Sequence, residues 1–77
     1  MEKTLFAVYL GGKHHNGLLE DHDLIFVVAT SKEEAKKLAL KKTKIKDGLH
    51  ADGAIAIHSV DGYSIKLIEE GKNENIG

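Results

Sequence analysis

The chain has 77 residues and a formal net charge of -1, so it is long enough for one small domain. It contains no cysteine, which excludes disulfide bonds and thiolate metal sites. No apolar run approaches the roughly 18 residues of a membrane-spanning helix, and residues 1–10 lack the features of a signal peptide, so we expect a cytoplasmic location and no membrane contact.

The first strand is predicted over Leu5 to Leu10, where aromatic and branched residues precede the breaker Gly11-Gly12. The stretch 11–22 is polar and contains Asn16-Gly17, which predicts a long hairpin loop. A second strand is predicted over His22 to Ala29. Both alternating sets of its side chains are apolar, which is typical of a strand in the interior of a sheet.

A helix is predicted to begin at Lys32. Ser31 can accept a hydrogen bond from a free amide of the first turn, and Glu34 can reach back to the Ser31 amide in a capping box. Asp47-Gly48 is expected to end the helix. The residues predicted to face the core are Ala35, Leu38, Ala39, Ile45 and the aliphatic stem of Lys42.

The segment 54–68 predicts a hairpin in which Asp61-Gly62 forms a two-residue type I′ turn. This turn sets a register that pairs Val60 with Tyr63 and Ser59 with Ser64, and it places His58 on the same apolar face as Val60. A histidine held in the core or in an interface is the more frequent interpretation of that position, and a pH-sensitive contact is the alternative.

The order strand, strand, helix, strand, strand predicts an α+β fold, with a four-stranded, mostly antiparallel sheet and one helix on one face. The single domain is predicted over residues 1–69, followed by a flexible tail over 70–77. Because one helix covers one face only, we expect a second copy of the chain to cover the other. The loop and tail of the same chain are the alternative cover. The predicted interface or cleft residues are Phe6, Val8, Tyr9, Asp23, Ile25, Val27, His58 and Tyr63.

Lysines are concentrated in residues 32–46, where seven lysines and two acidic residues give +5, while the remaining four lysines and ten acidic residues give -6. Such clustering can favour nucleic acid through counterion release. However, the chain has no arginine, the side chain that makes planar, two-pronged contacts with phosphates and guanine. We therefore interpret the lysines as a solvated helix face and do not expect nucleic-acid binding.

Five short motifs are spread between Leu5 and Leu67. They are Phe6-Ala7-Val8-Tyr9-Leu10-Gly11-Gly12, Glu20, His22-Asp23 leading into Phe26-Val27-Val28, Leu49-His50-Ala51-Asp52, and Val60-Asp61-Gly62-Tyr63. As a set they resemble a small bacterial domain-of-unknown-function family whose members carry one or two copies of the domain. The resemblance implies this fold and pairing between copies, and it implies no reaction.

Histidines in and beside the loops are the candidates for a metal site. His14, His15, His22 and His50 could supply imidazole ligands to zinc, nickel or copper. Their spacings match no rigid metal motif, so solvent-exposed loop histidines are the more frequent interpretation and no cofactor is expected. For His22 with Asp23, hydrogen bonds that shape the entry to the second strand are the alternative.

No catalytic site is predicted. Serines occur only at the helix cap and near the hairpin turn, which leaves no nucleophilic triad, and Gly11-Gly12 leads into a loop rather than a phosphate-binding helix. General acid–base chemistry by His22 with Asp23 is the remaining enzymatic alternative. The sequence thus predicts a non-catalytic binding or assembly domain that forms a homodimer, and the alternative is a small-ligand or metal-binding module that uses the histidines.

Overall fold

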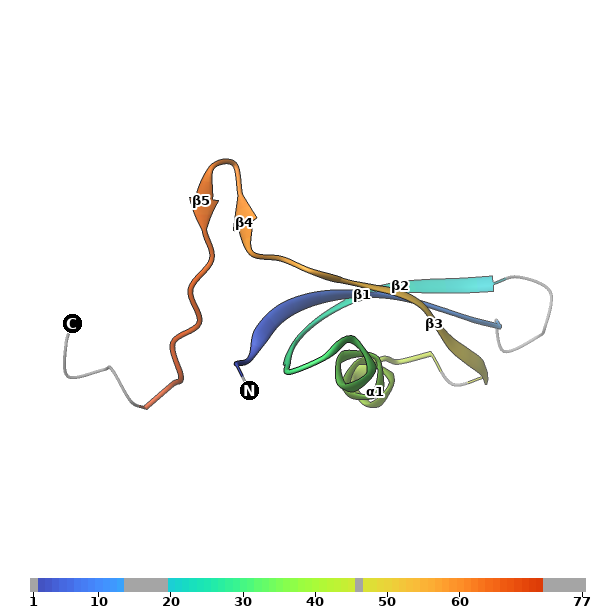
Figure 1. Ribbon diagram of the computed structural model, residues 1–77. Coiled ribbons are helices and arrows are strands. Elements are labelled where there is room, and N and C mark those ends of the chain that lie inside the picture. Colours follow the sequence, from blue (N-terminus) through green and yellow to red (C-terminus); the bar gives the residue numbers. More distant parts are fainter. Residues whose placement is uncertain (1, 14–19, 46, 72–77) are drawn as a thin grey trace.

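The computed structural model describes residues 2–13, 20–45 and 47–71 (Figure 1). The predicted α+β class, with one helix and antiparallel strands, is confirmed. Most of the predicted loop, residues 14–19, and residues 72–77 of the predicted tail lie outside the described residues. The elements are β1 (Thr4–Lys13), β2 (Glu20–Ala29), α1 (Lys32–Lys42), β3 (Asp47–Ala56), β4 (Ser59–Val60) and β5 (Tyr63–Ser64).

The first three strands form an antiparallel sheet in the order β2-β1-β3, and α1 packs across one face of all three (Figure 1). β2 was expected to be an interior strand, but it lies at an edge of the sheet. The two alternating sets of side chains point to the two faces of the sheet, so apolar residues in both sets make both faces apolar. Neighbouring strands are joined by backbone hydrogen bonds, which do not depend on these side chains. The pattern of β2 therefore indicates two apolar faces and not two neighbouring strands.

The prediction of one four-stranded sheet is wrong, because β4 and β5 form a separate two-stranded sheet. β3 begins at Asp47, before the predicted start at residue 54, and its pairing with β1 extends to Ala56. The Ile57 N–H then donates to the Leu5 carbonyl at 2.9 Å. β1 starts one residue before Leu5, so the chain beyond Ile57 has no strand of this sheet beside it and turns away.

The hairpin formed by β4 and β5 has the predicted turn. Asp61 and Gly62 have φ values of 54° and 83°, as the two central residues of a type I′ turn require. The predicted pairs Val60 with Tyr63 and Ser59 with Ser64 are confirmed. The strands are shorter than expected, since each has two residues.

The core lies between α1 and the sheet. Ala35 and Ala39 are the buried residues of the helix, and their small side chains let the helix backbone approach the strands closely. Leu38 is partly buried, as predicted for the inward stripe, whereas Ile45 lies beyond the end of the helix. The buried apolar residues are Phe6, Val8, Leu10, Val27, Ala29, Ala35, Ala39 and Ala54.

The start of α1 at Lys32 is confirmed, and half of the capping box forms as predicted. The Glu34 N–H donates to Ser31 Oγ at 3.1 Å. The Glu34 carboxylate does not return to the Ser31 amide but accepts hydrogen bonds from the Thr30 N–H at 2.6 Å and the Thr30 hydroxyl at 3.0 Å. Both groups of Thr30 are thus tied to the first turn, which fixes the path from β2 into the helix.

The helix ends at Lys42, before the predicted stop at Asp47-Gly48. Thr43 is in an extended conformation, and its N–H donates to the Ala39 carbonyl at 3.0 Å. Its hydroxyl donates to Asp23 Oδ2 at 3.0 Å and accepts from the Ile45 N–H at 3.2 Å. These bonds give the chain a non-helical alternative at a β-branched residue, so the helix stops there and β3 begins earlier.

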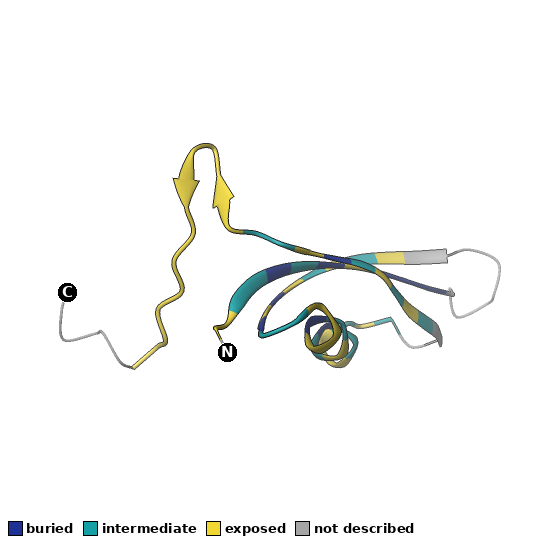
Figure 2. Cartoon of the chain, in the orientation of Figure 1, coloured by how far each residue is buried: buried dark blue, intermediate teal, exposed yellow. Residues whose placement is uncertain are grey.

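Beyond β3 the chain forms a projecting arm, which we define as residues 58–71. Every residue of the arm is exposed (Figure 2). The hairpin at its start rises from the sheet on the side opposite α1 (Figure 1). His58, predicted to lie on an apolar face, is exposed at the base of the hairpin because β3 ends before it. None of the described helices is long and apolar enough to span a bilayer.

Candidate functional site

The sheet face opposite α1, here called the open face, is apolar across all three strands. Directly paired residues of neighbouring strands share a face. Ala7 in the centre pairs with Phe26 on one side and Ile55 on the other. The next rows add Tyr9 with Leu24 and Leu5 with Val28, in the order set by the alternation of β1. The large side chains exposed on this face are Tyr9, Leu24, Phe26, Val28 and Ile55.

This surface is as large as the largest apolar patches of typical monomers. Phe26 is 52% exposed and Ile55 is 69% exposed. Five large side chains, each about half exposed and each with about 200 Å² of surface, amount to roughly 500 Å² of apolar area. Patches of about 300–600 Å² are the largest on typical monomers and often have a function. The open face is therefore the principal candidate site.

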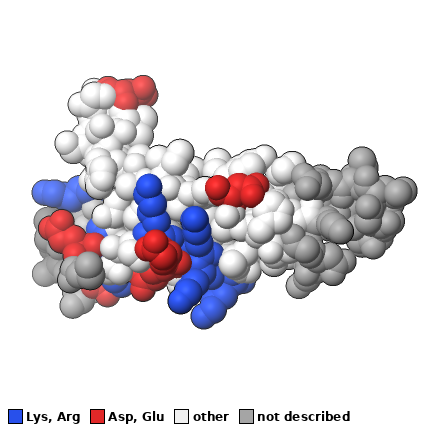
Figure 3. Space-filling view, turned by 45° about the vertical axis from the view of Figure 1, so that its right-hand side comes forward, with Lys and Arg blue, Asp and Glu red and all other residues white. Residues whose placement is uncertain are grey.

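Charge is concentrated on the other side of the molecule. The exposed or half-buried lysines of α1 include Lys32, Lys36, Lys37 and Lys41. In Figure 3 lysine side chains gather in the lower part of the view, while the surface that runs above them from the hairpin carries a small group of acidic atoms and is otherwise uncharged. Water solvates the helix side readily, but it has few polar side chains to hydrate on the open face.

One end of the open face carries aromatic and titratable groups. The His22 and Tyr9 rings are stacked, with centroids 5.3 Å apart and ring planes 10° from parallel. His22 pairs with Gly11, the residue two positions after Tyr9 on the same face, so the stack is a diagonal contact between β1 and β2. The stack extends the apolar surface of Tyr9 towards the titratable groups at this end of the open face.

A His–Asp pair lies on the other side of Gly11. His50 pairs with Gly11 across β1 and β3, and its Nδ1 lies 2.7 Å from Asp52 Oδ1. A Cβ at Gly11 would lie 2.8 Å from His50 Cε1. Because glycine has no Cβ, the imidazole has space at this position. Both side chains of the pair are about half exposed, which limits its contribution to between zero and about 1 kcal/mol.

The edge of the sheet at β2 is partly occupied by side chains from the end of α1. Lys42 Nζ donates to the Phe26 carbonyl at 3.0 Å. Asp23, at the start of β2, accepts from the Thr43 hydroxyl and from its own neighbour, the Leu24 N–H, at 3.0 Å each. A charged side chain that covers the edge of a sheet disfavours pairing with another chain along that edge. Association through the face is favoured by comparison.

The predicted interface residues fall into two groups. Tyr9 is on the open face, whereas Phe6, Val8 and Val27 are buried under α1 and belong to the core. Ile25 is partly buried on the same side as Val27. The structure thus assigns the opposite alternating set of β2 to the accessible surface: Leu24, Phe26 and Val28.

A signal for this assignment was present in the sequence. Ala29 is the last residue of β2 and precedes the helix cap by two residues, so a small side chain there fits beneath the alanine stripe of the helix. Residues two apart share a face, which places Val27 and Ile25 on the helix side and Phe26 on the other. The exposure of Ile55 could not be found in this way, because it depends on the pairing of β3 with β1, and the order of the strands was not predicted.

The remaining predicted residues do not converge on one site. Asp23 is used in the contact with Thr43, and Tyr63 lies near the tip of the hairpin. Of the four predicted metal ligands, His14 and His15 lie outside the described residues, and His22 and His50 lie on the two edge strands with Gly11 between them. Within the described part of the chain, no group of three or more histidine, aspartate or glutamate side chains is placed to hold a metal ion.

Comparison with known proteins gives a family for the chain. Searches of curated proteins and of solved structures found no match. A family model described as Domain of Unknown Function (DUF1543) matches residues 17–67, which include β2, α1, β3 and the hairpin. The match begins after β1 and therefore does not cover the motif from Phe6 to Gly12. The matched segment is more than half of the chain, and the chain belongs to this family of small domains of unknown function.

Proposed function

We propose that this domain is a non-catalytic assembly module that self-associates through its open face. The observation that supports the proposal is the continuous apolar surface formed by Leu24, Phe26 and Val28 of one edge strand together with Tyr9 and Ile55. α1 covers the opposite side of the sheet, and no element of the described chain covers this one.

The energy available from burial of this face is sufficient for association. About 500 Å² of apolar surface per subunit corresponds to roughly 12 kcal/mol at about 25 cal/mol per Å². The cost of losing translational and rotational freedom is about 4–15 kcal/mol for the whole complex. Two subunits each contribute their face, so the gain exceeds this cost, and the ordering of side chains and the desolvation of polar groups at the interface reduce the remaining surplus.

A second copy of the chain is the occupant that the geometry of the surface favours. The open face is one side of a three-stranded sheet, and its middle row runs from Phe26 through Ala7 to Ile55. Sheet faces are also suited to packing on their own kind, since two sheets stack about 10 Å apart in sandwich folds.

The proposal is tested by a charge placed at the centre of the face. Phe26→Lys should convert an associating protein into a monomer, because a lysine in a buried apolar interface would have to lose its hydration. Phe26→Leu keeps the face apolar and should retain the mass of the unaltered protein. Light scattering after gel filtration gives both masses. The proposal fails if the lysine and leucine variants have the same mass at every concentration.

The metal-binding alternative stays a prediction. It requires His14 and His15 to approach His22 and His50, and nothing in the described residues favours that arrangement. Zinc or nickel titration monitored through the imidazole NMR resonances tests it. Specific shifts of all four histidines at equimolar metal would support a site, and unchanged resonances would remove this alternative.

A further inference from the structure

The hairpin of the arm packs against no other helix or strand of the described chain. Within the described residues, Cα distances of 8 Å or less connect β4 to β5 but connect neither strand to any other helix or strand. A hairpin with strands this short is at best marginally stable by itself in water. A well-formed turn and ladder at this position therefore suggest a surface on which the hairpin packs.

The hairpin is also amphipathic. Val60 and Tyr63 pair directly and share one face, while Ser59 and Ser64 pair on the other. Tyr63 is 76% exposed, more than any other large apolar side chain among the described residues. Tyrosine is one of the residues that most often anchors protein interfaces.

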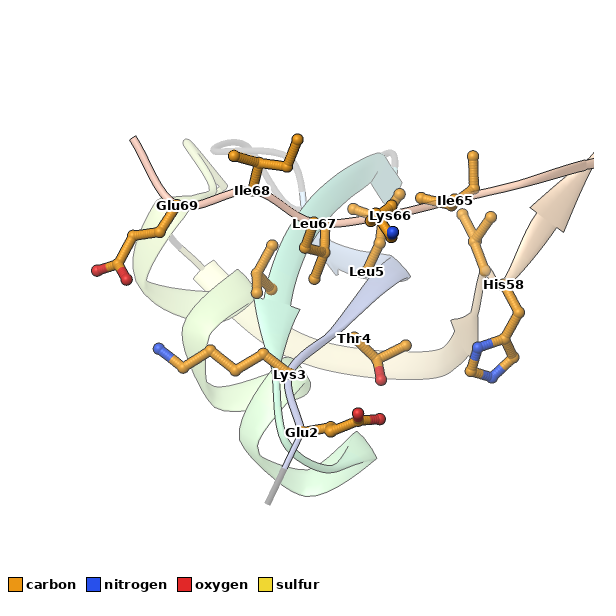
Figure 4. Close-up of a pocket in the computed structure, with 12 residues that line it drawn as sticks. Glu2, Lys3, Thr4, Leu5, His58, Ile65, Lys66, Leu67, Ile68 and Glu69 are labelled. Carbon is orange, nitrogen blue, oxygen red and sulfur yellow. The ribbon is translucent and has the colours of Figure 1, made fainter. Parts of the chain in front are cut away.

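A groove of about 650 Å³ lies where the rest of the arm passes the end of the sheet. Figure 4 shows the stretch from Ile65 to Glu69 crossing the beginning of β1, which carries Thr4 and Leu5. Leu5 and Val28 form the last row of the open face, so the groove floor continues that face. The apolar residues that line the groove are Leu5, Val28, Ile57, Ile65, Leu67 and Ile68.

The arm enlarges the surface that the open face offers to a second copy. The face alone provides about 500 Å² of apolar surface per subunit, whereas a standard interface buries roughly 800 Å² of apolar and polar surface per partner. The exposed apolar residues of the arm add about as much again, if each large side chain has about 200 Å² of surface. They are Val60, Tyr63, Ile65, Leu67 and Ile68. Face and arm together reach the area that a stable dimer needs.

The occupant of the groove is constrained by symmetry. The hairpin cannot enter the groove of its own chain without refolding, since it rises away from the sheet (Figure 1). In a two-fold dimer each subunit presents the same surface, so a protrusion and an adjacent groove on one chain can fit the groove and the protrusion of the other.

We propose that the β4–β5 hairpin of each copy occupies the groove of a second copy, with Val60 and Tyr63 packed against the row formed by Leu5, Val28 and Ile57. This inference rests on the proposed function and specifies how the two copies engage. The hairpins are exchanged reciprocally, and each hairpin covers the end of the partner's open face.

A tryptophan at position 63 tests the exchange directly, since the chain contains no other tryptophan. Tyr63→Trp should show a blue-shifted emission and several-fold weaker quenching by iodide once the protein is dimeric. Ser64→Trp, on the opposite face of the same hairpin, is the matched control and should keep the emission of a solvated indole. On dilution to monomer, the Tyr63→Trp emission should become that of the control.

Three results overturn the inference. The first is a dimer, established by its mass, in which the indole at position 63 remains as solvated as the one at position 64. The self-association proposal would survive that result, but the exchange of hairpins would not. The second is an indole at position 63 that is protected in the monomer, which would mean packing within one chain. The third is a monomer at all concentrations, which would remove both proposals.

Discussion

Phe26 and Ile55 lie on either side of Ala7 on the open face, although they belong to the two edge strands of the sheet. The small side chain of Ala7 separates two large ones, so the middle row of the face is apolar over its whole width. A partner that covers this row contacts all three strands at once.

The same substitution on the two sides of the sheet should have different consequences. Leu10 is fully buried and Leu24 is 54% exposed. Leu10→Ala should lower the free energy of unfolding by about 2–5 kcal/mol, because it removes buried methyl groups and leaves a cavity. Leu24→Ala should change the stability of the monomer by less than about 1 kcal/mol, as surface substitutions usually do.

Chemical denaturation at low protein concentration measures both effects. The association constant supplies the complementary readout, since Leu24→Ala removes apolar area from the open face and should weaken the dimer. A loss of monomer stability from Leu24→Ala as large as that from Leu10→Ala would show that Leu24 is covered within its own chain.

Gly11→Ala should displace the imidazole of His50. The new Cβ would lie 2.8 Å from His50 Cε1 and 3.3 Å from Asp52 Oδ2, so the ring must move. The ring is half exposed and can move at little cost, and alanine reduces the entropy of the unfolded chain by about 0.4–1 kcal/mol. The net change in stability should therefore be within about 1 kcal/mol.

The NMR resonances of His50 should shift in this variant, while those of His58, on the arm, should not. An unchanged His50 spectrum would contradict the close approach of the ring to Gly11.

Glu34 should make stability depend on acidic pH. Hydrogen bonds from the Thr30 N–H and hydroxyl, with a smaller contribution from Lys3, hold the pKa of Glu34 below its ordinary value of 4.5. A carboxylate whose pKa is depressed by folding stabilises the protein above the unfolded value, and that stabilisation is lost as pH falls through the folded value. The Glu34→Gln variant has no carboxyl group at this position and therefore lacks this pH dependence.

Melting temperatures between pH 7 and pH 3 test this prediction. The difference in melting temperature between the unaltered protein and the Glu34→Gln variant should be constant at pH values above the ordinary carboxyl range and should diminish below pH 4.5. A difference that stays constant down to the lowest pH would mean that the contacts with Thr30 do not favour the charged form.

Lys42 should prevent the edge of β2 from pairing with a strand of another chain. Lys42→Met retains much of the aliphatic stem but removes the ammonium group that contacts the Phe26 carbonyl. Stability should change by less than about 1 kcal/mol, while a mass above that of the dimer should appear as concentration rises, because an unguarded edge can pair with another chain. Lys41→Met, one residue earlier on α1, is the control and should not form larger species.

The sequence was informative about local structure and less informative about how the elements meet. The turn at Asp61-Gly62 and the helix start at Ser31 were predicted, because each depends on the chemistry of two or three neighbouring residues. The end of the helix was missed because it depends on a contact between Thr43 and the distant Asp23. Contacts of this kind are not visible in local patterns.

The same distinction, between local patterns and contacts of distant residues, explains which parts of the candidate site were predicted. Two apolar sets on the first two strands indicated a face that the helix does not cover, and the structure has such a face. The choice between Val27 and Phe26 as a surface residue depends on which set lies under α1, and the sequence analysis selected the set that is buried. Ile55 joins the face only because β3 pairs with β1, a long-range pairing that its sequence does not specify.

Sedimentation equilibrium of the unaltered chain is the most direct test of self-association through the open face. We predict a mass that rises with concentration from that of the 8.4 kDa monomer to twice that value. The midpoint should lie between about 1 μM and 1 mM, which corresponds to a binding free energy of about -8 to -4 kcal/mol. A mass that stays at the monomer value up to 1 mM would contradict the account.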